Sequence, residues 1–114
     1  MIYNIQQLAV NTILANYVIP IDTPTFLGVF KVPCFDASEV SKNVIIPDSE
    51  CGNVYEFVIT GTSEIYEDLT SGDIYFEDLG TWTVDLYYQA STTNLDPTLA
   101  TFIETFKIQV NGSA

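Results

Sequence analysis

Histidine is absent from this sequence, and basic residues are scarce. The chain of 114 residues has 15 Asp and Glu against 3 Lys and Arg, which gives a formal net charge of −12. The three cations are Lys31, Lys42 and Lys107. Nucleic-acid binding needs a basic footprint, and attachment to an anionic membrane surface needs one too. We therefore expect neither kind of partner.

The sequence also lacks the common signatures of enzymes. General acid–base chemistry most often uses histidine, and none is present. No Walker A, Gly-x-Gly-x-x-Gly or Gly-x-Ser-x-Gly motif occurs. Carboxylates are abundant, but a glycosidase also needs a cleft, for which a chain of this length offers little room. We predict a protein that is not an enzyme and needs no cofactor.

Cysteines are few, and long apolar runs are missing. Cys34 and Cys51 do not form a disulfide framework, and without histidine they offer no plausible zinc set. We expect reduced, partly buried thiols, with a bridge between them as the alternative. No stretch approaches the ~18–20 apolar residues of a membrane span. The N-terminus lacks the basic start of a secretory signal, so we expect no export.

What the sequence does contain is a pattern of short β-strands. Trp82, Val84, Leu86, Tyr88 and Ala90 alternate with polar residues, as expected for a strand with one buried face. β-branched and aromatic residues dominate elsewhere, and Pro, Gly, Asn and Asp interrupt them at short intervals. The predicted strands are Leu8–Leu14, Tyr17–Ile21, Phe26–Val32, Asn43–Ile46, Val54–Thr60, Gly72–Phe76, Thr81–Ala90 and Phe102–Val110.

The segments between these strands have turn or loop chemistry. The predicted connections are Asp22–Thr25, Phe35–Lys42, Asp48–Asn53, Gly61–Leu69, Glu77–Gly80 and Ser91–Thr101. Phe26–Val32 is apolar on both faces, so it is either a central strand or covered by a partner. The pattern predicts a single domain over residues 1–114. Its fold class is all-β, an immunoglobulin-like β-sandwich of about seven or eight strands.

The corner Asp78-Leu79-Gly80-Thr81-Trp82 supports this fold. Immunoglobulin-like domains often enter the second-last strand through Asp-x-Gly-x-Tyr, and Trp82 stands at the tyrosine position. An indole donates one hydrogen bond and accepts none, so the usual tyrosine-corner bond must change. We predict that Trp82 is buried between the sheets.

Acidic residues crowd the segment from 64 to 78. Hard oxygen ligands suit Ca²⁺, although the spacing of an EF-hand is absent. A solvated acidic edge, which also protects against edge-to-edge aggregation, is the simpler interpretation. The carboxylates that would surround a calcium ion are Glu67, Asp68, Asp73, Glu77 and Asp78.

Three further features point to a docking surface. Phe26, Leu27 and Val29 lie in the strand that is apolar on both faces, while Tyr75 and Tyr87 alternate away from the apolar face. Exposed tyrosines serve protein interfaces or stack on sugars, and they also occur as ordinary surface residues. The third feature is the loop segment Asn94-Leu95-Asp96-Pro97, whose turn chemistry predicts an ordered loop. It serves either as a docking element or only as a turn that sets the strand register.

The C-terminal third resembles a known family. The matching residues are Gly80-Thr81-Trp82-Thr83-Val84, Tyr87-Tyr88-Gln89, Thr93-Asn94-Leu95-Asp96-Pro97, Glu104 and Ile108-Gln109-Val110. This pattern is similar to that of small virion structural proteins, of the auxiliary or decoration type, in tailed phages that infect Bacteroidetes, crAss-like phages among them. It covers about thirty residues. Trp82 replaces a tyrosine-type aromatic, and Phe106 replaces a frequent glycine that would form a bulge.

The resemblance implies a non-enzymatic particle component. It points to an auxiliary or decoration protein that docks on the capsid surface, in many copies, with capsid or other virion proteins as partners. The expected localisation is the virion, after synthesis in the host bacterial cytoplasm. The alternatives are an immunoglobulin-like module that grips glycans or host surface proteins, and a tail or neck component.

Overall fold

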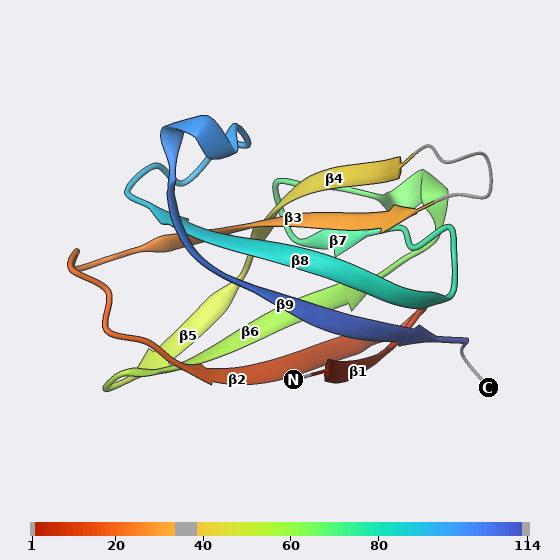
Figure 1. The fold of residues 1–114 in the computed structure, drawn as a ribbon, viewed down its shortest axis with the longest axis horizontal. Helices are drawn as coiled ribbons and strands as arrows, with labels where there is room; N and C mark the ends of the chain where they lie inside the picture. Colours follow the sequence, from red (N-terminus) through yellow and green to blue (C-terminus); the bar gives the residue numbers. More distant parts are fainter. Residues whose placement is uncertain (1, 34–38, 113–114) are drawn as a thin grey trace.

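Two β-sheets pack face to face in the computed structural model, which describes residues 2–33 and 39–112 (Figure 1). The strands are β1 (Ile2–Gln6), β2 (Val10–Asn16), β3 (Thr25–Pro33), β4 (Glu39–Ile46), β5 (Asp48–Cys51), β6 (Val54–Gly61), β7 (Asp73–Ile74), β8 (Gly80–Gln89) and β9 (Thr101–Asn111). Two short 3₁₀ turns, η1 (Glu64–Tyr66) and η2 (Pro97–Leu99), lie in the connections. None of the described residues form a helix of the length and apolarity that a membrane crossing requires.

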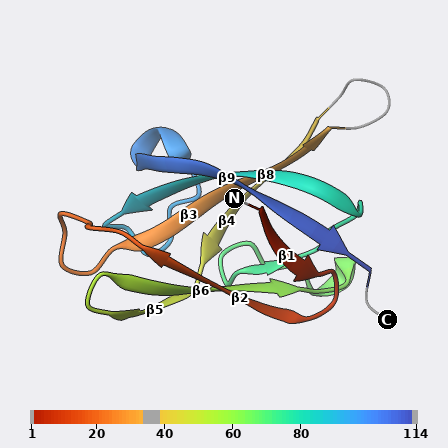
Figure 2. The ribbon, with the colours of Figure 1, turned by 60° about the horizontal axis from the view of Figure 1, so that its bottom comes forward.

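The order of the strands is that of an immunoglobulin-like domain. One sheet has the order β1-β9-β8-β3-β4, and the other has the order β2-β6-β5 with β7 beside β6. The strands β2, β6 and β5 correspond to B, E and D of immunoglobulin domains, and β3, β8 and β9 correspond to C, F and G. Figure 2 shows the two layers from below. The predicted all-β sandwich is confirmed, with nine strands in the described residues.

The sheets share one apolar core, and Trp82 is the largest side chain fully buried in it among the described residues. Trp82 has no exposed surface, and its ring meets Phe76 edge-to-face at 5.2 Å between centroids. Its indole Nε1 donates a 3.0 Å hydrogen bond to the carbonyl oxygen of Asp78. The indole thus ties the corner to the strand as a donor, and its predicted burial is confirmed.

Two connections between strands are closely constrained by their residues. Between β4 and β5 the chain passes from one sheet to the other at Pro47, which has no N–H to donate to a ladder. Between β1 and β2 the backbone of Gln7 presses against Gly61 of β6. A Cβ at Gly61 would lie 1.9 Å from the Gln7 carbonyl oxygen, so only glycine fits this crossing.

Several predicted boundaries were wrong. Tyr17–Ile21 is not a strand but an irregular connection, and Asp48–Asn53, predicted as a turn, contains β5. The predicted loop Phe35–Lys42 is a strand from Glu39 onward, and residues 35–38 lie outside the described residues. β1 was missed because it is an edge strand that pairs in parallel with the distant β9.

The structure describes only one of the two cysteines, Cys51. Cys51 is a free thiol and is exposed, so its predicted partial burial was wrong. Cys34 lies outside the described residues.

Candidate binding site at the loop end of the sandwich

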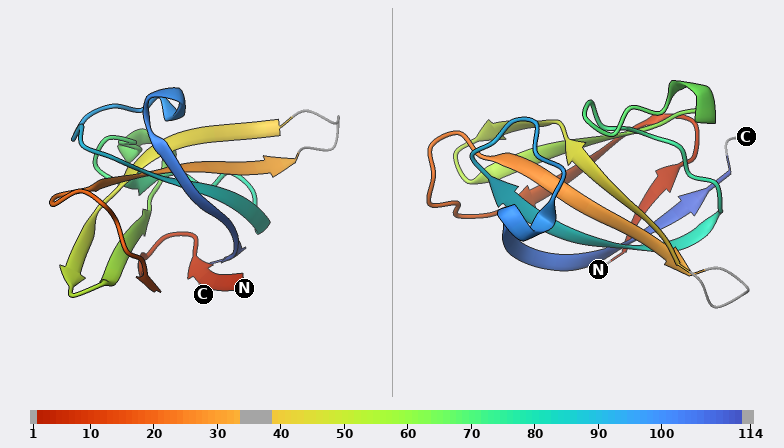
Figure 3. Two further views of the ribbon diagram at one scale, coloured as in Figure 1. Left: turned by 60° about the vertical axis from the view of Figure 1, so that its left-hand side comes forward. Right: turned by 90° about the horizontal axis from the view of Figure 1, so that it is seen from above.

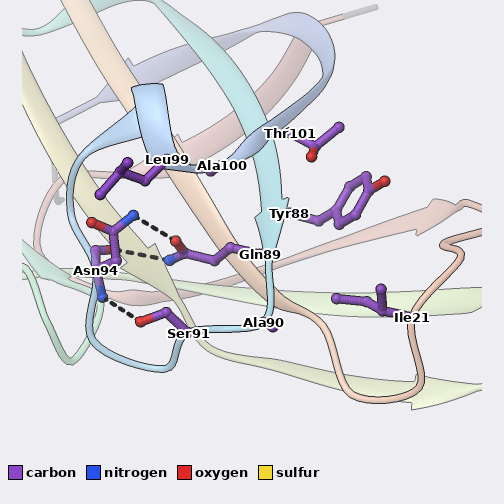
Figure 4. Close-up of a pocket in the computed structure, with 9 residues that line it drawn as sticks. All are labelled: Ile21, Tyr88, Gln89, Ala90, Ser91, Asn94, Leu99, Ala100 and Thr101. Carbon is purple, nitrogen blue, oxygen red and sulfur yellow. Dashed lines mark hydrogen bonds between the residues drawn. The ribbon is translucent and has the colours of Figure 1, made fainter.

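A pocket of about 550 Å³ opens at one end of the sandwich, beside the connection between β8 and β9 (Figure 4). Ile21 reaches it from the connection between β2 and β3. In antibody variable domains the corresponding loops, B–C and F–G, form part of the antigen-binding end. The lining residues are Ile21, Tyr88, Gln89, Ala90, Ser91, Asn94, Leu99, Ala100 and Thr101.

The wall of the pocket is an ordered loop held by its own side chains. Asn94 Nδ2 donates to Gln89 Oε1 at 2.7 Å, and Gln89 Nε2 donates to the Asn94 carbonyl oxygen at 2.8 Å. The Ser91 hydroxyl oxygen accepts from the backbone N–H groups of Thr93 and Asn94. These reciprocal bonds fix the loop, as the Asn94-Leu95-Asp96-Pro97 segment predicted.

Asp96 shapes the second half of the loop. Its carboxylate accepts hydrogen bonds from the hydroxyl and the backbone N–H of Thr98, at 2.7 and 2.9 Å. These bonds, the hydroxyl first, lower the pKa of Asp96 below its usual value. Pro97 follows at the first position of η2, where its missing N–H costs nothing. Asp96 is therefore a cap, and its carboxylate is already engaged.

The same loop folds over the outer face of the five-stranded sheet (Figure 3). Asn43 Nδ2 on β4 donates a 3.0 Å hydrogen bond to the Leu95 carbonyl oxygen, which fastens the loop to the sheet. On that face Leu27 and Val29 are 0% and 6% exposed. Their interpretation as docking residues was wrong, because the fold itself buries them. β3 is apolar on both faces because it is a central strand.

Phe26 points the other way, into the core. Its ring lies 4.9 Å from that of Tyr55 and 4.8 Å from that of Phe57, both edge-to-face. Phe26 has no exposed surface, so its predicted docking role was also wrong. It belongs to the packing between the sheets.

The two predicted tyrosines lie in separate places. Tyr87 on β8 is half-buried and meets the exposed Phe102 on β9 edge-to-face at 5.5 Å. Tyr75 lies under the ammonium of Lys42, which is 5.1 Å from the ring centroid. The structure does not bring the two rings together into one surface.

Lys42 organises the acidic segment, which the sequence did not reveal. Its ammonium bonds Glu67 at 2.7 Å, Glu77 at 3.2 Å and the carbonyl oxygen of Tyr75 at 2.6 Å. The Lys42 side chain is only 11% exposed. One partly buried cation therefore pairs with two of the carboxylates that the sequence offered to calcium and offsets one of their two negative charges.

Of the remaining acidic residues of that segment, Asp68 and Asp73 are joined through their backbones by two hydrogen bonds. Asp68 accepts hydrogen bonds from the hydroxyls of Thr70 and Ser71, and the Thr70 bond is the main cause that lowers the pKa of Asp68. In residues 2–33 and 39–112 no three ligand-type side chains group around a metal position. Here the acids act as turn and ion-pair residues.

The pocket is lined mostly by uncharged side chains. Among the described residues that line it, Tyr88 is the one titratable residue, and the two amides are already paired with each other. Sequence reasoning missed Gln89, which is 5% exposed, because it stands on the polar side of the alternation in β8. It also missed Ile21 and Tyr88 as pocket residues, since their proximity arises only from the fold.

Neither the family models nor the curated proteins compared with this chain match it. A solved structure from Bacteroides vulgatus, of a protein provisionally described as a glycoside hydrolase, is similar in fold. The TM-score is 0.51 at 10% identity, and the match covers 98% of this chain. The chain spans 17% of the length of that protein. This likeness concerns the sandwich fold alone.

Proposed function

We propose that this sandwich is a non-enzymatic phage virion structural protein, an auxiliary or decoration protein that docks on the capsid surface. One observation carries the proposal. The residues that carry the resemblance form a single unit in space, namely β8, its loop and β9. Within that unit Gln89, Asn94 and Asp96 have defined partners. The motif thus describes how this loop is built, which supports a shared loop architecture with those virion proteins.

The charge of the chain fits a docking role within a particle. A net charge of −12 makes copies of the chain repel one another, so close packing requires a partner surface that supplies Lys and Arg, or bound cations. Exposed ion pairs contribute only ~0–1 kcal/mol each. Affinity should therefore come from apolar contact, while charge sets orientation and association rate. The partners in this proposal are capsid or other virion proteins, with many copies of the chain per particle.

A glycan-binding module is the second candidate, and the pocket favours it. Tyr88 presents an aromatic ring at an open cavity, a common arrangement for stacking on a sugar. The structural neighbour, described as a glycoside hydrolase, is compatible with a sandwich that accompanies carbohydrate chemistry. A tail or neck component remains a variant of the first proposal.

The two candidates differ in how they respond to salt and sugars. Purified chain should be added to phage particles whose copy of this gene has been deleted, and binding followed by co-sedimentation. We expect binding that slows at high salt yet persists, and that free sugars and Tyr88→Ala leave unchanged. Failure to bind the particles, together with a glycan-array signal that Tyr88→Ala abolishes, would establish the second candidate instead.

A further inference from the structure

The edge of β2 is an open row of backbone hydrogen-bonding groups. Within residues 2–33 and 39–112, β2 pairs only with β6, and immunoglobulin domains fill the position on its other side with strand A. The Gly61 N–H donates to the Ala9 carbonyl, and the Tyr17 N–H donates to the Asn53 carbonyl. Because such pairs alternate along an antiparallel ladder, the N–H and C=O groups of Thr12 and Leu14 point away from β6.

A groove of about 360 Å³ runs beside this edge, between the two sheets. Ala15 and the edge-to-face pair of Tyr3 and Phe106 supply its apolar surface. The Tyr17 hydroxyl bonds Glu104 at its rim, and burial, followed by this bond, raises the pKa of Tyr17. The lining residues are Tyr3, Leu14, Ala15, Asn16, Tyr17, Glu104, Thr105 and Phe106. A strand added at β2 would direct alternate side chains into this groove.

The sequence of β2 itself carries none of the residues that usually protect an edge strand. Charged residues, proline or a covering loop normally prevent edge-to-edge pairing. β2 has the sequence VNTILAN, without charge or proline, and Val10 and Leu14 are 68% and 62% exposed. The opposite edge of the same sheet, β5, is short and carries Asp48 and Glu50. In this sheet one edge, β5, is protected and the opposite edge, β2, is not, which indicates that β2 is kept available for pairing.

We propose that the β2 edge accepts an extended strand from a partner protein, with apolar residues that enter the groove and a Lys or Arg that reaches Glu104. The charge around the edge selects this occupant. Glu56, exposed on β6 opposite Leu14, adds a second carboxylate, and the net charge of −12 disfavours a second copy of the chain. The assignment of the partner to a phage particle rests on the proposed function, but the strand-accepting edge does not.

A synthetic peptide tests the edge directly. The probe is a fluorescent peptide as long as β2, in which valine and threonine alternate and each end carries a lysine. Its binding is measured by fluorescence anisotropy. Leu14→Lys introduces repulsion at the edge, and Thr12→Pro removes an outward N–H without removing a ladder bond to β6. Val54→Lys is the matched control, because it places the same charge on the same sheet face but on the central strand β6.

We expect binding to weaken by about tenfold or more in Leu14→Lys and Thr12→Pro, and to change little in Val54→Lys. Glu104→Gln should weaken the lysine peptide more than a version with neutral ends. Equal binding by all variants, or equal binding of a peptide with glutamate ends, would overturn the proposal. A wild-type dimer that Leu14→Lys converts to a monomer would overturn it as well, because the occupant would be a second copy. If particles bind Leu14→Lys and Thr12→Pro as well as wild type while the peptide does not, the docking function and the strand-accepting edge both stand, and the assignment of the edge's partner to the particle is overturned.

Discussion

Removal of the Trp82 side chain tests the packing of the sandwich most severely. The side chain has no exposed surface, packs edge-to-face on Phe76 and donates its indole N–H to Asp78. A buried aromatic side chain covers roughly 150–250 Å², worth about 4–6 kcal/mol at about 25 cal/mol per Å². Alanine retains part of this, so Trp82→Ala should lower the free energy of unfolding by about 3–5 kcal/mol. That is a large share of the ~5–15 kcal/mol of a typical domain.

A second variant separates packing from the hydrogen bond. Trp82→Phe keeps an aromatic ring in the core but loses the indole donor, and a typical hydrogen bond contributes about 0.5–1.5 kcal/mol. Because Asp78 is exposed, its carbonyl oxygen can accept a hydrogen bond from water in the variant. The lost hydrogen bond should therefore cost a free energy near the lower end of this range, and the small cavity left by the indole adds to the cost. Urea unfolding, monitored by circular dichroism, measures the loss of stability in both variants, provided that their m-values equal that of the wild type. A loss below about 1 kcal/mol for Trp82→Ala, or a native fluorescence spectrum of hydrated indole, would refute the assigned packing.

Three further predictions follow from individual side chains. Lys42→Met should destabilise the fold by about 1–3 kcal/mol in urea unfolding, because Glu67 and Glu77 lose their cation and are only partly exposed to water. The control Lys107→Met, at an exposed position, should change the stability little. The hydrogen bond between the Tyr55 hydroxyl and Glu50, and then burial, raise the pKa of Tyr55 to about 12. The stability linked to this hydroxyl is therefore fully present below pH about 10 and is lost as the pH rises through about 12. Ultraviolet titration of phenolate, with Tyr55→Phe as reference, should show this late ionisation, and ionisation of Tyr55 near pH about 10 would contradict it. Cys51 should react with a thiol reagent in the native protein, and reducing agent should leave the melting temperature nearly unchanged, whereas a drop of about ten degrees would indicate a bridge.

The sequence predicted the parts of the fold that depend on local pattern. Two-residue alternation identified β6 and β8, a strand-like run at the end of the chain identified β9, and a continuous apolar run identified β3. β5 was taken for a turn because its residues are polar and exposed, although pairing with β6 makes it a strand. β1 could not be predicted from its local sequence pattern, because it forms through pairing with β9, more than a hundred residues away.

The candidate site divides in the same way. The order of the loop was predictable because Asn94 and Asp96 bond close neighbours in the chain. The burial of Leu27 and Val29 was not, because the loop that crosses their face is fastened there by Asn43, a residue distant in sequence. The hub at Lys42 was missed for the same reason, since its two carboxylates follow it by 25 and 35 positions in the numbering.

The protein content of phage particles tests the central claim most directly. Particles of a phage that encodes this chain should be purified on a density gradient and their proteins quantified by mass spectrometry. We predict that the chain migrates with the particles, in many copies and at a fixed ratio to the major capsid protein. Its absence from the particles, while it is abundant in the lysate of the same infected cells, would contradict the assignment as a virion structural protein.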